Sequence, residues 1–302
     1  MNRRILAVLL CVFLAPALLL AASEGHFDRT LSVSGAVTLD VATGSGGDIT
    51  VATGAANQVV IHGTILPSKW SFGNDDAVQR VQSNPPIEQT GNSIRIGYNL
   101  PEEIKRHVSI SYEITVPAET ALQAHTGSGN IDATGLRQAA QLQTGSGDIR
   151  ARDLGHGLQA HTGSGGIRAE NVAAPFNAQT GSGEIDASLT GSGDIDVQTG
   201  SGSIRVSGVK GPVRAHTGSG SIEVAGSVAG PWQLHSGSGN IRLALGSGSN
   251  FNVNVHTNSG SIHSDLPITV QGSMGGKQLV GKVGAGGPEL EASTSSGDVE
   301  IR

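Results

Sequence analysis

The chain has 302 residues, of which 45 are glycine and 3% are aromatic, and its formal net charge is −6. So few aromatic side chains argue against a conventional globular core, and regularly spaced Ile, Val and Leu argue against a disordered Gly- and Ser-rich chain. The charge is mild and dispersed, with no basic patch, which argues against nucleic acid as a partner. We therefore expect a repeat architecture.

The first residues, 1–22, have the order of a signal peptide. Two arginines precede an apolar run over residues 5–20, and small residues follow it. We predict cleavage after Ala22 or Ser23 and export to the periplasm, the cell surface or the extracellular space. The alternative is an uncleaved membrane anchor, which the short run and Pro16 disfavour.

The only cysteine, Cys11, lies inside this apolar run and would leave with the leader. It follows Leu10 rather than a small residue, which makes it a poor lipidation site. The mature chain is therefore expected to have no disulfide and no membrane span, and its stability must come from the repeats.

The mature chain, residues 24–302, is predicted to form one domain. Stretch 27–61 is interpreted as an early coil of the repeat, with Leu39, Val41, Thr43 and Ile49 in roles that recur later. Stretch 63–107 breaks the repeat and is interpreted as an insertion that caps the exposed strand edges. A short helix over 74–83 and strands over 92–98 and 108–116 are predicted around it.

A four-residue motif, T-G-S-G, then recurs at nearly constant spacing. Coils of about 18 residues start their turn at Thr126, Thr144, Thr162, Thr180, Thr199, Thr217, Ser236 and Thr257. The same motif at Thr190 falls between two of these positions and is interpreted as a half-coil insertion that leaves the main register intact. Residues 267–302 close the chain with the variant T-S-S-G at Thr294.

Each coil contains apolar residues at alternate positions on both sides of the turn, which is the signature of a strand with one buried face. The apolar residues four positions before the first residue of each turn motif are Leu122, Ala140, Leu158, Phe176, Ile195, Val213, Trp232 and Val253. The apolar residues that follow the turn are Ile131, Ile149, Ile167, Ile185, Ile204, Ile222, Ile241 and Ile262. Large and small residues alternate between neighbouring columns, as a narrow interior of constant volume requires. A third apolar column, at Leu136, Leu154, Val172, Val209 and Val228, marks the far corner.

The fold class is therefore an all-β, single parallel β-solenoid (β-helix). The aliphatic spacing is not six, which excludes a triangular hexapeptide helix, and the general rule for parallel crossovers favours a right-handed path. The corner glycines are predicted to supply a positive φ, which a β-carbon makes costly.

Three stretches resemble the bacterial putative-adhesin family: Y-E-I-T-V-P from Tyr112 to Pro117, the repeated T-G-S-G-x-I units, and the ending S-G-D-V-E-I. This resemblance implies an exported β-strand-repeat domain of unknown function, similar to the head domains of autotransporter adhesins. It implies a surface role and carries no information on chemistry.

Two kinds of metal site were considered. Calcium requires six to eight oxygen ligands, and the residue after each G-S-G varies too much to supply them: Asn130, Asp148, Gly166, Glu184, Asp194, Ser203, Ser221 and Asn240. One residue before each turn lies a column of His and Gln, in which His216, His235 and His256 are predicted to stack as a candidate Zn²⁺ or Ni²⁺ site. Because Gln occupies the column equally well, a solvated polar ladder is favoured, and no cofactor is expected.

Catalysis is disfavoured by the pattern of charge. The outward positions Asp132, Arg150, Arg168, Asp186, Arg205, Glu223 and Arg242 mostly alternate in sign, which predicts cross-strand ion pairing rather than an acid–base pair. The runner-up function is a carbohydrate-active β-helix, a polysaccharide lyase or hydrolase, with its site in 63–107.

The favoured function is a non-catalytic envelope or surface scaffold that binds a cell-surface, envelope or glycan partner. One candidate binding surface is the polar column of His and Gln beside the turns. The other is a corner stripe of hydroxyls, formed by Ser128, Ser146, Ser164, Ser182, Ser201, Ser219 and Ser238.

Overall fold

The computed structural model describes residues 24–68, 74–246, 248–271 and 276–302. The predicted signal peptide lies outside these residues. Among the described helices, none is long and apolar enough to cross a membrane.

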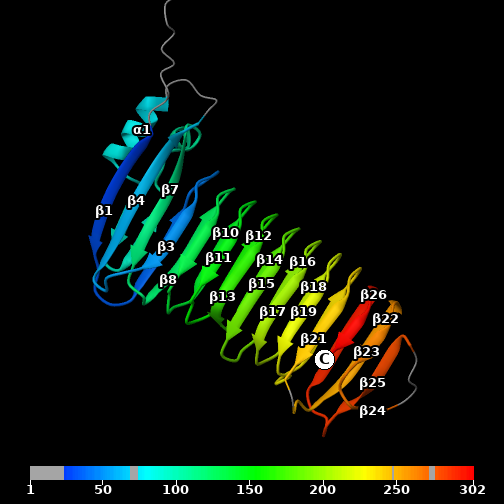
Figure 1. Cartoon of the computed structure of the whole chain (residues 1–302). Coiled ribbons are helices and arrows are strands. Elements are labelled where there is room, and N and C mark those ends of the chain that lie inside the picture. The colour runs from blue at the N-terminus through cyan, green and yellow to red at the C-terminus, as the bar shows by residue number, and fades with distance from the viewer. Residues whose placement is uncertain (1–23, 69–73, 247, 272–275) are drawn as a thin grey trace, which may run out of the picture.

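Two long sheets face each other and share one core, and each regular coil contributes one strand to each sheet (Figure 1). Sheet A has the order β1 (Gly25–Ser32), β4 (Gln58–Pro67), β7 (Val108–Val116), β3 (Ile49–Thr53), β9 (Ile131–Thr134), β11 (Ile149–Arg152), β13 (Ile167–Ala173), β15 (Ile185–Thr190), β17 (Ile204–Val209), β19 (Ile222–Gly226), β21 (Ile241–Leu245), β27 (Val299–Ile301), β23 (Ile262–Ser264).

Sheet B has the order β24 (Ile268–Val270), β25 (Gln278–Val283), β22 (Phe251–Ser259), β26 (Glu289–Ser296), β20 (Trp232–Ser236), β18 (Val213–Thr217), β16 (Ile195–Thr199), β14 (Phe176–Thr180), β12 (Leu158–Thr162), β10 (Ala140–Thr144), β8 (Thr120–Thr126), β2 (Val37–Ala42), β6 (Ser93–Ile96), β5 (Ile87–Thr90). The strands of the regular coils pair in parallel, so the predicted parallel β-solenoid is confirmed.

The predicted register is confirmed along the regular coils. Ile149, Ile167, Ile185 and Ile204 are cross-strand neighbours in sheet A and are all buried. In sheet B, Leu122 and Ala124 lie beside Ala140 and Leu142 of the next coil, so large and small side chains compensate as predicted. The far-corner column from Leu136 to Val228 is also buried.

The extra motif at Thr190 lies at the opposite corner from the others. It ends β15 in sheet A and leads into β16 in sheet B, whereas the regular motifs lead from sheet B to sheet A. Both neighbouring strands keep their register, with Phe176 beside Ile195 and Ile185 beside Ile204. The interpretation as a half-coil is therefore confirmed.

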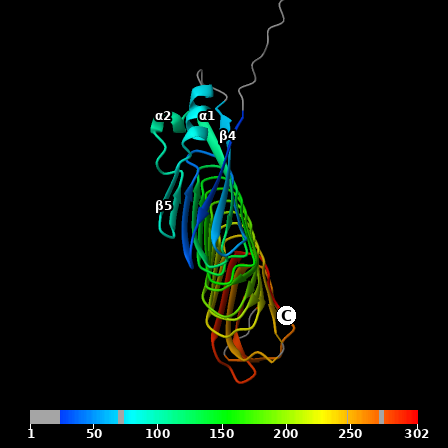
Figure 2. The same cartoon turned by 90° about the vertical axis from the view of Figure 1, so that its left-hand side faces the viewer.

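At the N-terminal end, β2 and β3 form the predicted early coil, with Leu39 beside Leu122 and Ile49 beside Ile131. The rest of stretch 27–61 was interpreted incorrectly, because β1 and β4 are antiparallel strands that extend sheet A beyond β7. Helix α1 (Asn74–Ser83) packs against this extension, and the short α2 (Glu102–Lys105) lies nearby (Figure 2). The predicted helix over 74–83 is thus present.

At the C-terminal end the stacking order departs from the chain order. Strand β26 lies between β20 and β22, and β27 lies between β21 and β23 (Figure 1). The coil at Thr294 is therefore the neighbour of the coil at Ser236, with Thr294 beside Ser236. The coil at Thr257 comes after it, next to Thr294 on the other side.

A polar clamp fixes β6 against β2 on the outer side of sheet B. The Tyr98 hydroxyl donates a hydrogen bond to Asp40 Oδ1 at 2.5 Å, and the Arg95 guanidinium lies 4.4 Å from the centre of the Tyr98 ring. Desolvation, together with the bond to Asp40, raises the pKa of Tyr98 to about 12, whereas Arg95 acts in the opposite direction.

This clamp predicts a loss of stability at alkaline pH. Because the folded state raises the pKa of Tyr98 from 10.0 to about 12, its contribution is fully present below about pH 10 and is lost as the pH rises through about 12. Tyr98→Phe should therefore flatten the fall in the free energy of unfolding between about pH 9 and about pH 12. Urea titrations at several pH values test this. Equal alkaline losses in both proteins would contradict it.

Candidate functional site

The corner of the solenoid presents the predicted serine stripe to solvent. All seven serines from Ser128 to Ser238 are exposed, and each lies between two glycines at the turn from sheet B to sheet A. The Ser128 hydroxyl donates to the carbonyl of Ser45 at 2.7 Å. The other six hydroxyls make no side-chain hydrogen bond to a described residue, so they are available to a partner.

Beneath the serines lies a ladder of buried threonines that the sequence analysis did not recognise. Thr162 Oγ1 donates to the carbonyl of Gly147 in the preceding coil at 2.9 Å and accepts from the amide of Gly165 at 3.1 Å. The same pair of bonds recurs at Thr144, Thr180 and Thr199. A signal was present, because Thr126 continues the inward alternation of Leu122 and Ala124.

Thr162→Val should destabilise the solenoid by about 2 kcal/mol or more, because it leaves a buried carbonyl and a buried amide without their hydroxyl partner. Thr162→Ser is the matched control. It keeps both bonds and should cost only about 1 kcal/mol for the lost methyl group, and serine occupies the equivalent position at Ser236. Denaturant titrations of the two variants decide this, and equal losses would show that the hydroxyl contributes nothing.

The glycines of the regular corners do not have the predicted positive φ. In the regular corners from Thr126 to Ser236, none of the motif glycines has a φ in the left-handed region, and neither does Asn258 in the later variant. A positive φ does occur at Gly44 and Gly47 in the first turn and at Gly191 in the half-coil turn. A β-carbon on Gly165 would lie only 1.9 Å from the carbonyl oxygen of Gly147. Glycine is required because backbones of neighbouring coils approach this closely.

The column considered for calcium is used for hydrogen bonding between coils. Asn130 Oδ1 accepts from the amide of Asp148 at 3.0 Å, and Asp148 Oδ1 accepts from the amide of Gly166 at 2.9 Å. Asp298 repeats this with Ser261, which lowers the pKa of its carboxyl. Within the described ranges, no group of three or more His, Cys, Asp and Glu is placed to hold a metal ion.

The predicted stack of His216, His235 and His256 is present for the first two residues and wrong for His256. The rings of His216 and His235 do stack, with centroids 5.1 Å apart and an interplanar angle of 6°. Strand β26 then intervenes, so the other neighbour of His235 is Ser293, whose hydroxyl lies 2.9 Å from His235 Nδ1. His256 lies beyond Ser293 and contacts the Asn258 side chain instead.

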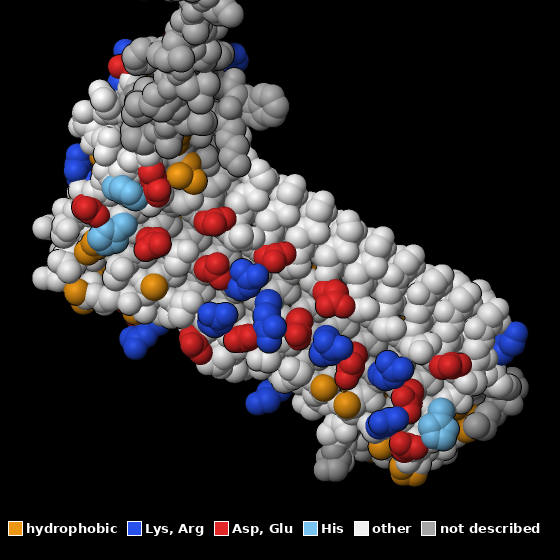
Figure 3. All heavy atoms as spheres, turned by 45° about the horizontal axis from the view of Figure 1, so that its top comes forward, with side chains coloured by type: hydrophobic (Ala, Val, Ile, Leu, Met, Phe, Trp, Pro, Cys, Tyr) orange, Lys and Arg blue, Asp and Glu red, His pale blue; other side chains and the backbone are white. Residues whose placement is uncertain are grey.

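The outward charges of sheet A form ion pairs, and the predicted cross-strand pairing is present in part: Arg150 pairs with Asp132 and Arg205 with Glu223, whereas Arg168 pairs within its own strand. Arg205 Nε lies 3.3 Å from Glu223 Oε2, and Arg168 Nε lies 2.7 Å from Glu170 Oε1. Arg242 pairs with Glu300 of the inserted β27, at 3.6 Å, and is also the cross-strand neighbour of Glu223. Acidic and basic side chains are mixed in a band along the stack (Figure 3). Most charged side chains of this band are therefore paired with one another.

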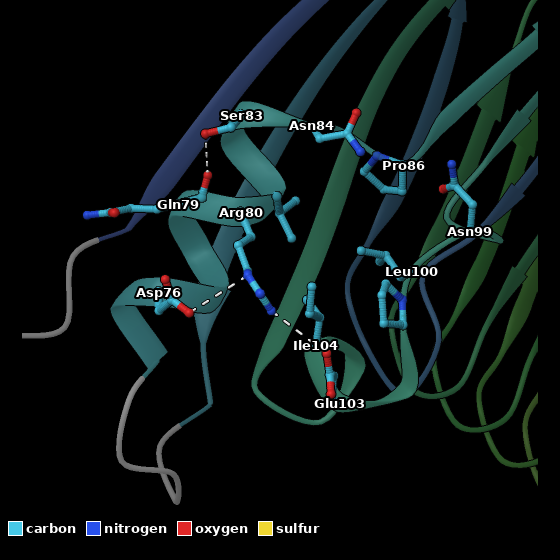
Figure 4. Close-up of a pocket in the computed structure, with 12 residues that line it drawn as sticks. Asp76, Gln79, Arg80, Ser83, Asn84, Pro86, Asn99, Leu100, Glu103 and Ile104 are labelled. Carbon is cyan, nitrogen blue, oxygen red and sulfur yellow. Dashed lines mark hydrogen bonds and ion pairs between the residues drawn. The ribbon is translucent and has the colours of Figure 1, made fainter.

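A pocket of about 640 Å³ lies in the capping segment, between α1 and α2 (Figure 4). Arg80 spans it, with Nε 3.8 Å from Asp76 and a terminal nitrogen 3.7 Å from Glu103. These two carboxylates are 80% and 74% exposed. Both carboxylates are therefore solvated and paired with Arg80.

Residues 87–302 match the model of the Toastrack DUF4097 family. The chain belongs to this family. The matched part of this Toastrack domain runs from β5 through every regular coil to the inserted β27. The expected membership of a family of β-strand-repeat domains is thereby confirmed.

Solved structures similar to this Toastrack chain include a putative cell adhesion protein from Clostridium sporogenes, at 11% identity and a TM-score of 0.24, over 92% of this chain and 99% of that chain. A putative adhesin from Bacteroides fragilis matches at 11% identity and a TM-score of 0.32, over 93% and 99%. A putative lipid binding protein from Parabacteroides distasonis matches at 12% identity and a TM-score of 0.31, over 92% and 97%. These scores are too low to support an argument, so the family rests on the sequence match. No curated protein matched the chain.

Proposed function

We propose that this Toastrack protein is an exported, non-catalytic binding scaffold of the adhesin type, whose partner contacts an extended outer face. The observation that carries the proposal is the repetition of exposed polar side chains in register over consecutive coils. On sheet B, for example, Gln143, His161 and Gln179 follow one another on neighbouring strands. Such a surface offers many equivalent weak contacts rather than one enclosed site.

Two surfaces are candidates for this contact. One is the exposed serine corner, and the other is the pair of outward columns on sheet B beside it. Contacts on adjacent coils recur at about 4.8 Å, so a long partner can engage several of them at once. Binding of this kind gains its strength from multivalency.

A binding screen tests the proposal. The protein should be retained by at least one of three groups of immobilised targets: glycans, matrix proteins or cell-wall polymers. Substitutions are then added coil by coil on each candidate surface. Binding should decline gradually with their number, because each contact is weak. A single substitution that abolished binding or revealed hydrolysis in a folded protein would instead indicate a localised site and favour a carbohydrate-active enzyme.

A further inference from the structure

The outer face of sheet B is uncharged over four consecutive strands, β8, β10, β12 and β14. Two columns of outward side chains cross these strands, and Ala121 of β8 is the one further outward residue on them. All eight members of the two columns are amides or imidazoles: Gln123, His125, Gln141, Gln143, Gln159, His161, Asn177 and Gln179. They stand in register in two columns. We refer to these eight residues as the amide face.

The side chains of the amide face have no polar partners among the residues that the structure describes. Within the described ranges, none of the eight makes a side-chain hydrogen bond or ion pair, whereas the charges of sheet A are engaged, as at Arg152 and Glu170, 3.3 Å apart. Each amide offers two donors and one acceptor, and each neutral imidazole offers one of each. The amide face therefore presents a regular array of unused hydrogen-bonding groups.

The chemistry of this array restricts the partner. The array has no Lys or Arg to hold a phosphate, sulfate or carboxylate. The charged residues that flank the column of Gln123 are both acidic, Asp40 at one end and Asp196 at the other. An acidic polymer is therefore disfavoured. A folded protein is disfavoured because the eight side chains include no large apolar residue to anchor an interface core, and Ala121 beside them is small.

An uncharged polymer of hydroxyl groups fits these conditions. Hydroxyls donate and accept, as amides do, and neutral partners avoid the desolvation of charge that contact with sheet A would require. We propose that the amide face binds an extended, neutral polysaccharide. The proposal rests on the proposed function and assigns its surface and its ligand class. Three strand spacings of about 4.8 Å give the array a length of about 14 Å along the stack, enough for several sugar units in contact at once.

The test uses cellulose and chitin as neutral polymers and polygalacturonate as an acidic one. The protein should be retained on a neutral polymer and much less on polygalacturonate. The triple variant Gln141→Ala, Gln143→Ala, Gln159→Ala should lose at least about tenfold in affinity, because it removes three donor–acceptor groups. The control Arg150→Ala, Arg152→Ala, Arg168→Ala removes three long side chains from sheet A and should bind as before. Circular dichroism melts establish that both variants fold.

Preference for polygalacturonate, unchanged binding in the amide-face variant, or an equal loss in the sheet A control would overturn the assignment. Retention on matrix proteins alone would also overturn it, while leaving the proposed function in place. If the protein were retained on none of the polymers and proteins, both would fail.

Discussion

Gly165→Ala is expected to destabilise the protein by more than about 3 kcal/mol, at or beyond the upper end of what overpacking usually costs. The new β-carbon would lie 1.9 Å from the carbonyl oxygen and 2.5 Å from the carbonyl carbon of Gly147. Both atoms belong to the backbone of the neighbouring coil, so neither can move without separating the stack. The smaller conformational entropy of alanine in the unfolded chain gives back only about 0.4–1 kcal/mol.

The matched control is Ser164→Ala, one residue away on the same corner. Ser164 is exposed and its hydroxyl makes no bond to a described residue, so its removal should change stability by less than about 0.5 kcal/mol. Thermal and urea unfolding followed by circular dichroism compare the two. If both variants unfold like the wild type, coils do not approach as closely as the structure has them.

The second large effect is expected for Ile167→Asp, which should cost more than about 4 kcal/mol. Ile167 is 2% exposed and lies between Ile149 and Ile185 of the adjacent coils. The substitution removes a buried aliphatic side chain and places a carboxylate where no partner is available. Gln159→Asp introduces the same carboxylate on the outer side of sheet B, where it should be nearly neutral. Equal destabilisation by the two would contradict the inward assignment of Ile167.

The middle of the molecule could be predicted from the sequence because the information there is local and repeated. Once the motif at Thr144 is aligned with that at Thr162, alternation assigns Leu142 inward and Gln143 outward, and stacking follows. The order of the last coils could not be predicted in this way. Thr257 and Thr294 begin similar motifs, and neither motif indicates which of the two residues lies beside Ser236.

The sequence also does not show why the corner residues are glycines or which outward polar side chains have partners. A recurring role for glycine can come from a positive φ or from the close approach of two backbones. Only the coordinates show that the second reason applies at Gly165. Similarly, Gln141 and Arg168 are both outward polar residues in the sequence. Only the contacts show that Arg168 is paired with Glu170 and that Gln141 is not bonded to another described side chain. The sequence therefore shows the column of His and Gln as polar but does not show that its side chains lack the partners that the charged ones have.

The insertion of β26 and β27 has a consequence for how the chain assembles. During synthesis, residues 251–264 emerge before residues 289–301, yet β22 and β23 have no parallel neighbour until β26 and β27 arrive. The stack therefore cannot grow coil by coil to its end. The antiparallel pair β22–β25 must wait undocked or dock provisionally against β20, and then yield its place. Completion depends on contacts between distant segments, which form slowly compared with the local ones that build the middle.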